Sequence, residues 1–282
     1  MSALVVRAVG GPCLVTDAGR VGLAGVGVGR SGAADRSSYG LANRLLGNDA
    51  GAAALEVVLG GLEVEATGTC WVSVTGAPVE VDRDGRREPT GAVLALRPGQ
   101  RLRLGTPGSG LRSYLAVRGG FRVAPVLGSA SRDTLSALGP APLAAGDRLA
   151  VGPAPGGTML VDAVPPASYD AVPVLRVVPG PRADWVRDAD ALVRSAWRVA
   201  PESDRVGVRL AGPAFEAAGR GELPSEGALR GAIQIPPDGR PVVFGPDHPV
   251  TGGYPVIGVV VDADTDRLAQ ARPGDEVRFR WA

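Results

Sequence analysis

The residues best suited to chemistry stand together between Asp247 and Pro255. In this run, Asp-His-Pro-Val-Thr-Gly-Gly-Tyr-Pro, an acid, an imidazole, a hydroxyl and a phenol share one predicted loop. His248 is the only histidine of the chain, and an imidazole near its ordinary pKa can act as a general base. Two glycines would let the backbone approach a ligand closely. The alternative is a polar loop whose Asp-His pair only orders a turn, and on residue types alone that outcome is the more common one.

A second candidate is the run from Ser203 to Leu210. If this run is a strand, every second side chain points to the same face, so Arg205, Gly207 and Arg209 share one face. Arginines two residues apart can bind a carboxylate or a phosphate through paired hydrogen bonds. The alternative is a solvated outer face, which is the commoner place for charges on a strand.

Polar residues also flank a glycine-rich run, Gly22 to Gly29, with Asp17-Ala-Gly-Arg20 before it and Ser31-Gly-Ala-Ala-Asp35 after it. The glycines at 25, 27 and 29 alternate and do not reproduce the GxGxxG pattern of dinucleotide-binding loops, so they do not favour such a site. Further along, Leu127 to Asp133 is either an anion-binding turn or a polar corner.

The composition excludes several kinds of chemistry. The chain contains no lysine, and therefore has no Walker A loop and no side chain that can form a Schiff base or carry biotin. A single histidine excludes a histidine-based metal cage, and no metal site is predicted. Cys13 and Cys70 lie in apolar surroundings and are interpreted as core residues in a reduced, cytoplasmic protein.

The elements that must position these residues are mainly short strands. Short runs of three to six residues rich in Val, Leu and Ile, bounded by Gly, Pro or Asp, recur along all 282 residues. The N-terminal run is too short for a signal peptide, and no apolar stretch approaches the length of a membrane span. The strands predicted are 4–9, 54–58, 62–66, 71–75, 101–104, 114–117, 175–178, 206–210, 233–235, 242–244 and 256–261.

Three helices are predicted, over residues 34–46, 183–200 and 265–271. Asp35 is the expected N-cap of the first, and apolar residues at helical spacing support the second. A turn followed by an alternating strand occurs three times, beginning at Arg97, Ala145 and Arg272. A change to Pro- and Gly-rich composition predicts a linker at 152–173, between an N-terminal β subdomain at 1–151 and a C-terminal β-barrel subdomain at 174–282.

Ordered motifs from about residue 4 to residue 280 resemble those of the biotin-dependent carboxyltransferase family. This family includes the C subunit of bacterial 5-oxoprolinase, the second subunit of allophanate hydrolase, the sporulation regulator KipA and the carboxyltransferase region of urea amidolyase. The motifs are Asp17-Ala-Gly-Arg20, Ser31-Gly-Ala-Ala-Asp35, Leu41 to Asn48, Leu55-Glu56, Tyr114 to Gly120, Leu127-Gly-Ser129, Ser203-Asp-Arg205 with Gly207 and Arg209-Leu210, Gly231 to Pro236, Asp238-Gly239 and Thr251 to Pro255.

The resemblance implies a mainly β fold with a few helices, built as two cyclophilin-like β-barrel subdomains with a site between them. We expect Asp247, His248, Thr251 and Tyr254 to line a pocket shared with Asp35 and Asn43. In this interpretation three residues are catalytic and eight bind substrate. The catalytic residues are Asp247, His248 and Tyr254; the substrate-binding residues are Asp17, Arg20, Asp35, Asn43, Arg205, Arg209, Gln234 and Thr251.

The resemblance also implies an activity shared among several chains. We expect one chain of an ATP-dependent amide hydrolase, most closely the C subunit of 5-oxoprolinase, which opens 5-oxoproline to glutamate. ATP would act at the level of the complex, without covalent biotin on this chain. The expected partner is a smaller companion chain, similar to the B subunit of 5-oxoprolinase, to KipI or to the first subunit of allophanate hydrolase. Whether a third chain also takes part in the complex is left open. The alternatives are a KipA-like regulatory binding protein and a carboxyltransferase that acts with a separate biotin carrier.

Overall fold

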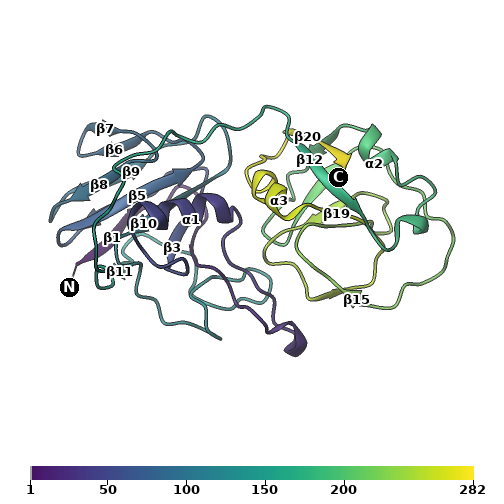
Figure 1. Ribbon diagram of the computed structural model, residues 1–282, viewed down its shortest axis with the longest axis horizontal. Coiled ribbons are helices and arrows are strands. Elements are labelled where there is room, and N and C mark those ends of the chain that lie inside the picture. Colours follow the sequence, from purple (N-terminus) through teal and green to yellow (C-terminus); the bar gives the residue numbers. More distant parts are fainter. Residues whose placement is uncertain (1) are drawn as a thin grey trace. The chain divides into compact units, whose positions relative to one another are not determined.

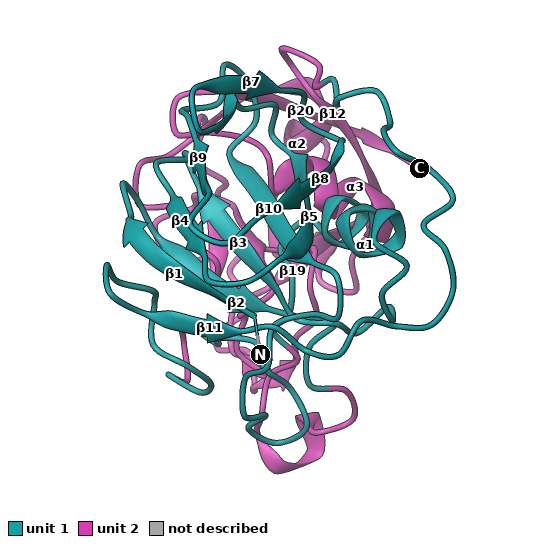
Figure 2. Ribbon diagram, turned by 90° about the vertical axis from the view of Figure 1, so that its left-hand side faces the viewer, with its two compact units in different colours: residues 1–20, 31–133, 137–168 teal, residues 21–30, 134–136, 169–282 magenta. Residues whose placement is uncertain are grey.

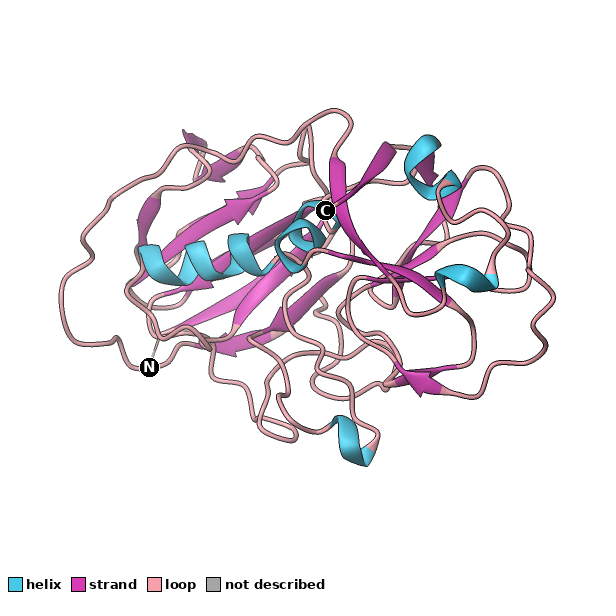
Figure 3. Cartoon of the chain, turned by 45° about the vertical axis from the view of Figure 1, so that its right-hand side comes forward, coloured by secondary structure: helices cyan, strands magenta, loops and turns pink. Residues whose placement is uncertain are grey.

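Short strands make up most of the regular structure, and helices are few (Figure 3). The computed structural model describes residues 2–282. Three predicted strands have the observed bounds, Ala54–Val58, Arg101–Leu104 and Val242–Phe244, and the others are found within two residues. The predicted mainly β fold class is therefore confirmed. Within residues 2–282, no helix has the length and apolar character needed to cross a membrane.

The chain divides into two compact units, and the division is not a single cut (Figure 2). Unit 1 comprises Met1–Arg20, Ser31–Asp133 and Ala137–Ser168. Unit 2 comprises Val21–Arg30, Thr134–Ser136 and Tyr169–Ala282. The final passage from unit 1 to unit 2 falls inside the predicted linker, whereas the two short excursions have no counterpart in the predicted contiguous domains.

Unit 1 consists of two antiparallel sheets that enclose one apolar core (Figure 1). One sheet has the order β11-β1-β4-β9-β6-β7 and the other the order β2-β3-β10-β5-β8. Alternate residues of the longer strands enter the core, as the pleat of a strand requires. The strands are β1 (Ala3–Ala8), β2 (Cys13–Thr16), β3 (Ala54–Val58), β4 (Glu63–Ala66), β5 (Cys70–Gly76), β6 (Val81–Arg83), β7 (Arg86–Glu88), β8 (Val93–Leu96), β9 (Arg101–Leu104), β10 (Arg112–Val117) and β11 (Arg148–Ala150).

Helix α1 (Arg36–Leu45) lies against the five-stranded sheet of unit 1 (Figure 1). Asp35 caps it as predicted, because its carboxylate accepts a hydrogen bond from the backbone N–H of Ser38 at 2.9 Å. Tyr39 and Ala42 pack with Tyr114 of β10 in a second apolar cluster. The helix therefore closes the outer face of this sheet.

Unit 2 is built around a closed barrel of seven strands in the order β12-β19-β16-β17-β14-β13-β20. A barrel has no free strand edges, so its short strands pair with one another on both sides. The elements are η1 (Ala24–Val26), β12 (Val174–Pro179), η2 (Ala183–Trp185), α2 (Ala191–Arg194), β13 (Trp197–Val199), β14 (Gly207–Ala211), β15 (Glu226–Gly227), β16 (Ala232–Gln234), β17 (Val242–Phe244), β18 (Thr251–Gly252), β19 (Val256–Val260), α3 (Asp262–Leu268) and β20 (Glu276–Trp281).

The threefold turn-and-strand pattern is confirmed. In each copy a glycine adopts a positive φ, 82° at Gly99, 98° at Gly146 and 91° at Gly274. In each copy the residue after the glycine donates its backbone N–H to the carbonyl three residues earlier. This is a β-turn that requires glycine at its third position, which explains why the same short pattern recurs. The strands that follow are β9, β11 and β20.

The long helix predicted over residues 183–200 is wrong. This stretch contains the short helices η2 and α2 and then β13, which pairs with β14 and β20. Val186, Leu192 and Trp197 do face one core, but each comes from a different part of the stretch. The helical spacing of apolar residues therefore arose from short segments packed on the same side of the barrel.

The third predicted helix exists but begins earlier, at Asp262 rather than Thr265, and ends at Leu268. In its first turn the buried Asp264 accepts three hydrogen bonds from Arg176 of β12, from the backbone N–H, Nε and Nη2, at 2.8 to 3.0 Å. These hydrogen bonds from Arg176 lower the pKa of the Asp264 carboxyl. The pair fixes α3 to the barrel.

This pair predicts a pH dependence of stability. A carboxyl whose pKa is lowered by folding stabilises the protein above its unfolded pKa, and that stabilisation is lost as the pH falls through the folded pKa. We expect Arg176→Gln to lower the unfolding free energy at neutral pH and to have a smaller effect in acid. Urea titrations of both proteins from pH 7 down to pH 3 measure this. Arg278→Gln, which removes the exposed Arg278–Glu276 pair, is the control; equal losses at every pH would contradict the prediction.

Candidate functional site

Arg205 and Asp247 continue the pairing of two barrel strands beyond their ends. β14 and β17 pair from Gly207 with Phe244 onward. Past that point, the backbone N–H of Gly245 donates to the carbonyl of Val206 at 2.9 Å, and that of Asp247 donates to the carbonyl of Arg205 at 3.0 Å. These backbone bonds hold the two side chains opposite each other.

The Asp247 carboxylate is fully buried, and Arg205 and Thr134 are among the residues that donate hydrogen bonds to it. Nε and Nη2 of Arg205 donate to it at 2.8 and 3.0 Å. The backbone N–H and the hydroxyl of Thr134 donate to its Oδ2 at 2.9 and 2.7 Å. Arg205 is only 6% exposed, and a two-point pair with a carboxylate is the arrangement that best compensates a buried guanidinium. Asp247 therefore anchors the loop that contains His248.

Arg205, Gly207 and Arg209 do not share one face of a strand, contrary to the prediction. Asp204 accepts hydrogen bonds from the backbone N–H groups of Val206 and Gly207, at 2.8 and 3.0 Å, and this turn delays the strand until Gly207. Arg205 consequently lies outside the strand and turns inward, while Arg209 is exposed. The two arginines do not form one anion site.

His248 is half-buried, and contacts with Phe244 and Pro249 help to fix its ring. Its ring stacks on Phe244 at 5.8 Å between centroids, with an angle of 14°. Its Nδ1 lies 2.7 Å from the carbonyl of Pro249. Because a carbonyl can only accept, Nδ1 is the donor, and in the neutral ring Nε2 is then the basic nitrogen. The orientation suits a general base that acts through Nε2.

The Thr251–Pro255 segment is positioned by Gln234 of β16. The buried Gln234 donates through Nε2 to the carbonyl of Tyr254 at 3.2 Å. A Cβ at Gly252 would lie only 2.7 Å from that same Nε2, so a larger residue there would displace the Gln234 amide. Thr251 is exposed on the two-stranded β15–β18 ladder, and Tyr254 is 46% exposed.

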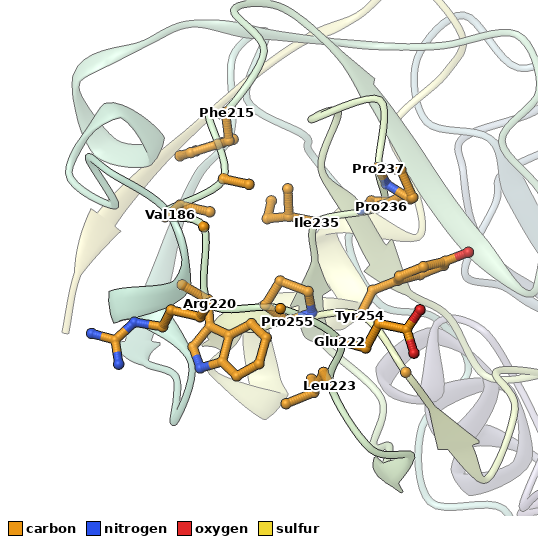
Figure 4. Close-up of a pocket in the computed structure, with 15 residues that line it drawn as sticks. Val186, Phe215, Arg220, Glu222, Leu223, Ile235, Pro236, Pro237, Tyr254 and Pro255 are labelled. Carbon is orange, nitrogen blue, oxygen red and sulfur yellow. The ribbon is translucent and has the colours of Figure 1, made fainter.

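A pocket of about 490 Å³ opens beside this segment (Figure 4). Its walls are mainly apolar, and the ring of Tyr254 extends outward from its edge in Figure 4. The segment after β14 is tied to η2 along one side, because Arg220 donates to the carbonyl of Asp184 and forms an ion pair with its carboxylate, both at 2.9 Å. The lining residues are Trp185, Val186, Phe215, Ala217, Gly219, Arg220, Gly221, Glu222, Leu223, Ile235, Pro236, Pro237, Gly253, Tyr254 and Pro255.

In unit 1, Asp17 follows β2 and is buried against the turn that lies between β10 and β11. Its Oδ1 accepts hydrogen bonds from the hydroxyls of Ser129 and Ser131, both at 2.6 Å, and from the backbone N–H of Gly19 at 2.8 Å. Its Oδ2 accepts from the backbone N–H of Ala130 at 2.6 Å. The run 127–133, left open as an anion-binding turn or a polar corner, thus binds the carboxylate of Asp17.

Asp35 and Asn43 are both held at α1. The side-chain amide of Asn43 donates to the carbonyl of Ala52 at 3.0 Å and accepts from Asn48 at 2.9 Å. Below the helix, Tyr114 donates from its hydroxyl to the fully buried carboxylate of Glu56 at 2.8 Å. Burial and the nearby charge of Glu56 raise the pKa of Tyr114 well above its ordinary value, so this phenol stays protonated.

The cysteines are core residues, as predicted. Burial raises the pKa of the Cys13 thiol to about 12 and that of Cys70 to about 11, so neither is a thiolate at neutral pH. Among residues 2–282 there is no group of three His, Cys, Asp or Glu side chains spaced to hold a metal ion.

The structure brings Arg205, Asp247 and His248 together in unit 2, where Gln234 also supports the Tyr254 carbonyl. The catalytic and substrate-binding roles assigned to these residues stay predictions, as does the pocket shared with Asp35 and Asn43, which belong to unit 1. Sequence reasoning missed Thr134, since nothing in its neighbours signals a bond to a carboxylate over 100 residues away. It also missed Trp185 and Phe215 as residues that line the pocket.

Comparisons with known proteins find relatives over nearly the whole chain. The C subunit of 5-oxoprolinase from Escherichia coli is 39% identical over 270 residues, covering 94% of this chain and 86% of that protein. The crystal structure of a protein named TTHA0988 superimposes with a TM-score of 0.91 at 38% identity, over 99% of this chain. The urea amidolyase of K. lactis gives a TM-score of 0.90 at 28% identity, over 98% of this chain.

The two solved structures belong to longer proteins, since this chain covers 56% of TTHA0988 and 18% of the K. lactis enzyme. The family described as "Carboxyltransferase domain, subdomain A and B" matches residues 26–281. That match includes the barrel, the Arg205–Asp247 pair and the Thr251–Pro255 segment, and it agrees with the order of motifs along the sequence. The chain therefore belongs to the carboxyltransferase domain family, with subdomains A and B.

Proposed function

We propose that this chain is the C subunit of a 5-oxoprolinase complex, which opens 5-oxoproline to glutamate with ATP. The observation that carries the proposal is the 39% identity to the Escherichia coli protein over nearly the full length of both chains. Because the sequence similarity covers 94% of this chain, it includes both units and not only the barrel. The chemistry of the residues agrees, because a fixed imidazole and an exposed phenol are groups that can move protons during the opening of an amide.

Within this proposal, Asp247 and Gln234 position the reacting segment and do not themselves meet the substrate. The carboxylate of Asp247 is already engaged by Arg205 and Thr134, and Gln234 supports the Tyr254 carbonyl. His248 through Nε2 is the proposed base. The apolar pocket next to Tyr254 suits the methylene face of a small ring, because apolar walls with few polar groups are typical of ligand sites.

The proposal requires partner chains. The sequence has no lysine, so a phosphate-binding loop of the Walker type must come from another chain. Several large apolar side chains are exposed and would be available to an interface with another chain. They include Val21 and Val26 at 73% and 76% exposure, and Leu160 at 92%. We propose a cytoplasmic complex with a smaller companion chain through an interface of more than about 2,000 Å².

Reconstitution tests the function directly. The chain is co-expressed with the product of its neighbouring gene and with any third chain that co-purifies. We expect glutamate to form from 5-oxoproline only when ATP and all chains are present, and no ATP hydrolysis by this chain alone. His248→Gln should abolish turnover without dissociating the complex, and Arg240→Gln, a change at an exposed side chain outside the predicted site, is the matched control.

A second function is favoured by the family match and by the K. lactis structure. In this alternative the chain transfers a carboxyl group from carboxybiotin held on a separate carrier, because this chain has no lysine to carry biotin. If the reconstituted complex forms but yields no glutamate, while added carboxybiotin is consumed in the presence of an amide acceptor, the second function replaces the first.

A further inference from the structure

Arg20 is a buried arginine, and one nitrogen of its guanidinium has no hydrogen-bond acceptor among the described residues. It is only 2% exposed. Its Nε donates to the carbonyl of Val126 at 3.0 Å, and its Nη2 donates to the carbonyl of Ser131 at 2.6 Å. Across the described part of the chain, its Nη1 has no hydrogen-bond partner, although that atom is shielded from solvent. Two N–H groups of a charged side chain are therefore buried without an acceptor.

The fold treats other buried arginines differently. Arg205 has the carboxylate of Asp247 at 2.8 Å, and Arg112 has that of Glu56 at 3.4 Å. The hydrogen bonds of Arg20 go to carbonyl oxygens instead. The carboxylate nearest in sequence, Asp17, is already engaged by two serine hydroxyls and two backbone N–H groups. A buried positive charge without a negative partner is costly, so native structures rarely leave one uncompensated.

We propose that Nη1 of Arg20 binds the carboxylate of a small-molecule ligand. The guanidinium is held on one edge by the two carbonyls, which leaves Nη1 fixed in direction and ready to donate two hydrogen bonds. Arginine prefers carboxylates because its planar donors match their oxygens. The choice of carboxylate for the test rests on the proposed function, in which 5-oxoproline is the small carboxylate that the complex takes up.

The chain next to Arg20 has the freedom that entry of a ligand needs. Gly22 and Gly27 adopt positive φ angles of 84° and 81°, and a Cβ added at either would meet no atom within 4 Å. Glycine in open space is free to change its backbone angles. Beyond the far end of this segment, Ala33 donates its backbone N–H to the carbonyl of Asp17 at 3.0 Å. The two glycines therefore give the chain between Arg20 and Ser31 the local backbone freedom that a ligand would need to reach the buried guanidinium.

The test compares two lactams that differ only in the carboxylate, 5-oxoproline and 2-pyrrolidinone. Binding to the assembled complex is measured by calorimetry. We expect wild type to bind 5-oxoproline at least about tenfold more tightly than 2-pyrrolidinone, the difference that a charge-assisted pair supplies. Arg20→Lys and Arg20→Gln should remove most of that preference and leave 2-pyrrolidinone binding unchanged. Arg30→Gln, an exposed arginine nearby, should keep the full preference.

Each outcome separates this inference from the proposed function. If the complex opens 5-oxoproline but the Arg20 variants keep the wild-type preference, the inference is wrong and the function stands. If no 5-oxoproline is opened, yet acetate and bicarbonate raise the melting temperature of wild type and not of Arg20→Lys, the carboxylate site stands without that substrate. If wild type shows no preference for either lactam and no response to carboxylates, the inference is overturned. Because the comparison of the two lactams uses wild type, it holds even if the variants fold poorly.

Discussion

Replacing Asp247 with alanine is expected to lower the unfolding free energy of unit 2 by about 3–5 kcal/mol. The substitution removes the carboxylate that pairs with the buried Arg205, and it also leaves two donors of Thr134 without their acceptor. A buried charge that has lost its partner is far more costly than a pair that was never there. Denaturant titration followed by tryptophan fluorescence measures the change, because three of the four tryptophans lie in unit 2.

Two comparisons make this prediction sharp. Asp238→Ala removes an exposed carboxylate that accepts from the backbone N–H of Arg240, and it should cost less than about 1 kcal/mol. A double change of Arg205 and Asp247 to leucine should cost less than Asp247→Ala alone, since it removes both charges. Asp247→Asn keeps the size of the side chain, so a fall in kcat with little loss of stability would support the role of Asp247 in positioning the His248 loop. If Asp247→Ala and Asp238→Ala behave alike, the pair has no anchoring role.

The second large effect is expected at Trp197, where alanine should cost about 3–5 kcal/mol. The indole is fully buried in the barrel, stacks on Phe215 at 5.7 Å between ring centroids, and donates from Nε1 to the carbonyl of Leu192 at 2.9 Å. Gly212 leaves room for it, since a Cβ there would come within 2.6 Å of the ring. Truncation therefore leaves a cavity and removes a buried hydrogen bond.

Circular dichroism during urea titration measures this change without relying on the fluorescence of the residue that is removed. Trp71→Ala is the control, because that side chain is 41% exposed on β5 of unit 1. Trp197→Phe should fall between wild type and alanine. A loss at Trp197 no larger than that at Trp71 would contradict the packing described for the barrel.

Local sequence signals, such as turn residues and helix caps, predicted the structure correctly where all the residues of the signal belong to one element. The strand Arg101–Leu104 follows Pro98 and Gly99, which specify the turn before it, and Asp35 marks the start of α1 by its own hydrogen bond. The signal failed at residues 183–200, because apolar residues of several short segments share one core and imitate the spacing of one helix. The spacing of apolar residues indicates which side chains face the core. It does not indicate whether those residues belong to one helix or to several short elements.

The candidate site was predictable only in part for a related reason. The loop from Asp247 to Tyr254 could be picked out from its residue types, but the partner of each side chain could not. Arg205 was expected to share a strand face with Arg209, and the turn made by Asp204 directs it inward. The contacts of Asp247 with Thr134 and of Asp17 with Ser131 span more than 100 residues. Such pairings depend on the three-dimensional course of the chain and leave no pattern in a single sequence.

The two excursions of the chain affect the order in which unit 2 can fold. Val21–Arg30 and Thr134–Ser136 belong to that unit, yet they leave the ribosome well before the barrel strands. Domains generally form as soon as their segments are available during synthesis. Unit 1 can therefore complete its sheets before Asp247 has been synthesised, and thus before Thr134 can form its hydrogen bonds to Asp247. A fragment that starts at Tyr169 contains every barrel strand but lacks both donors of Thr134, so unit 2 cannot be separated from the rest of the chain by one cut.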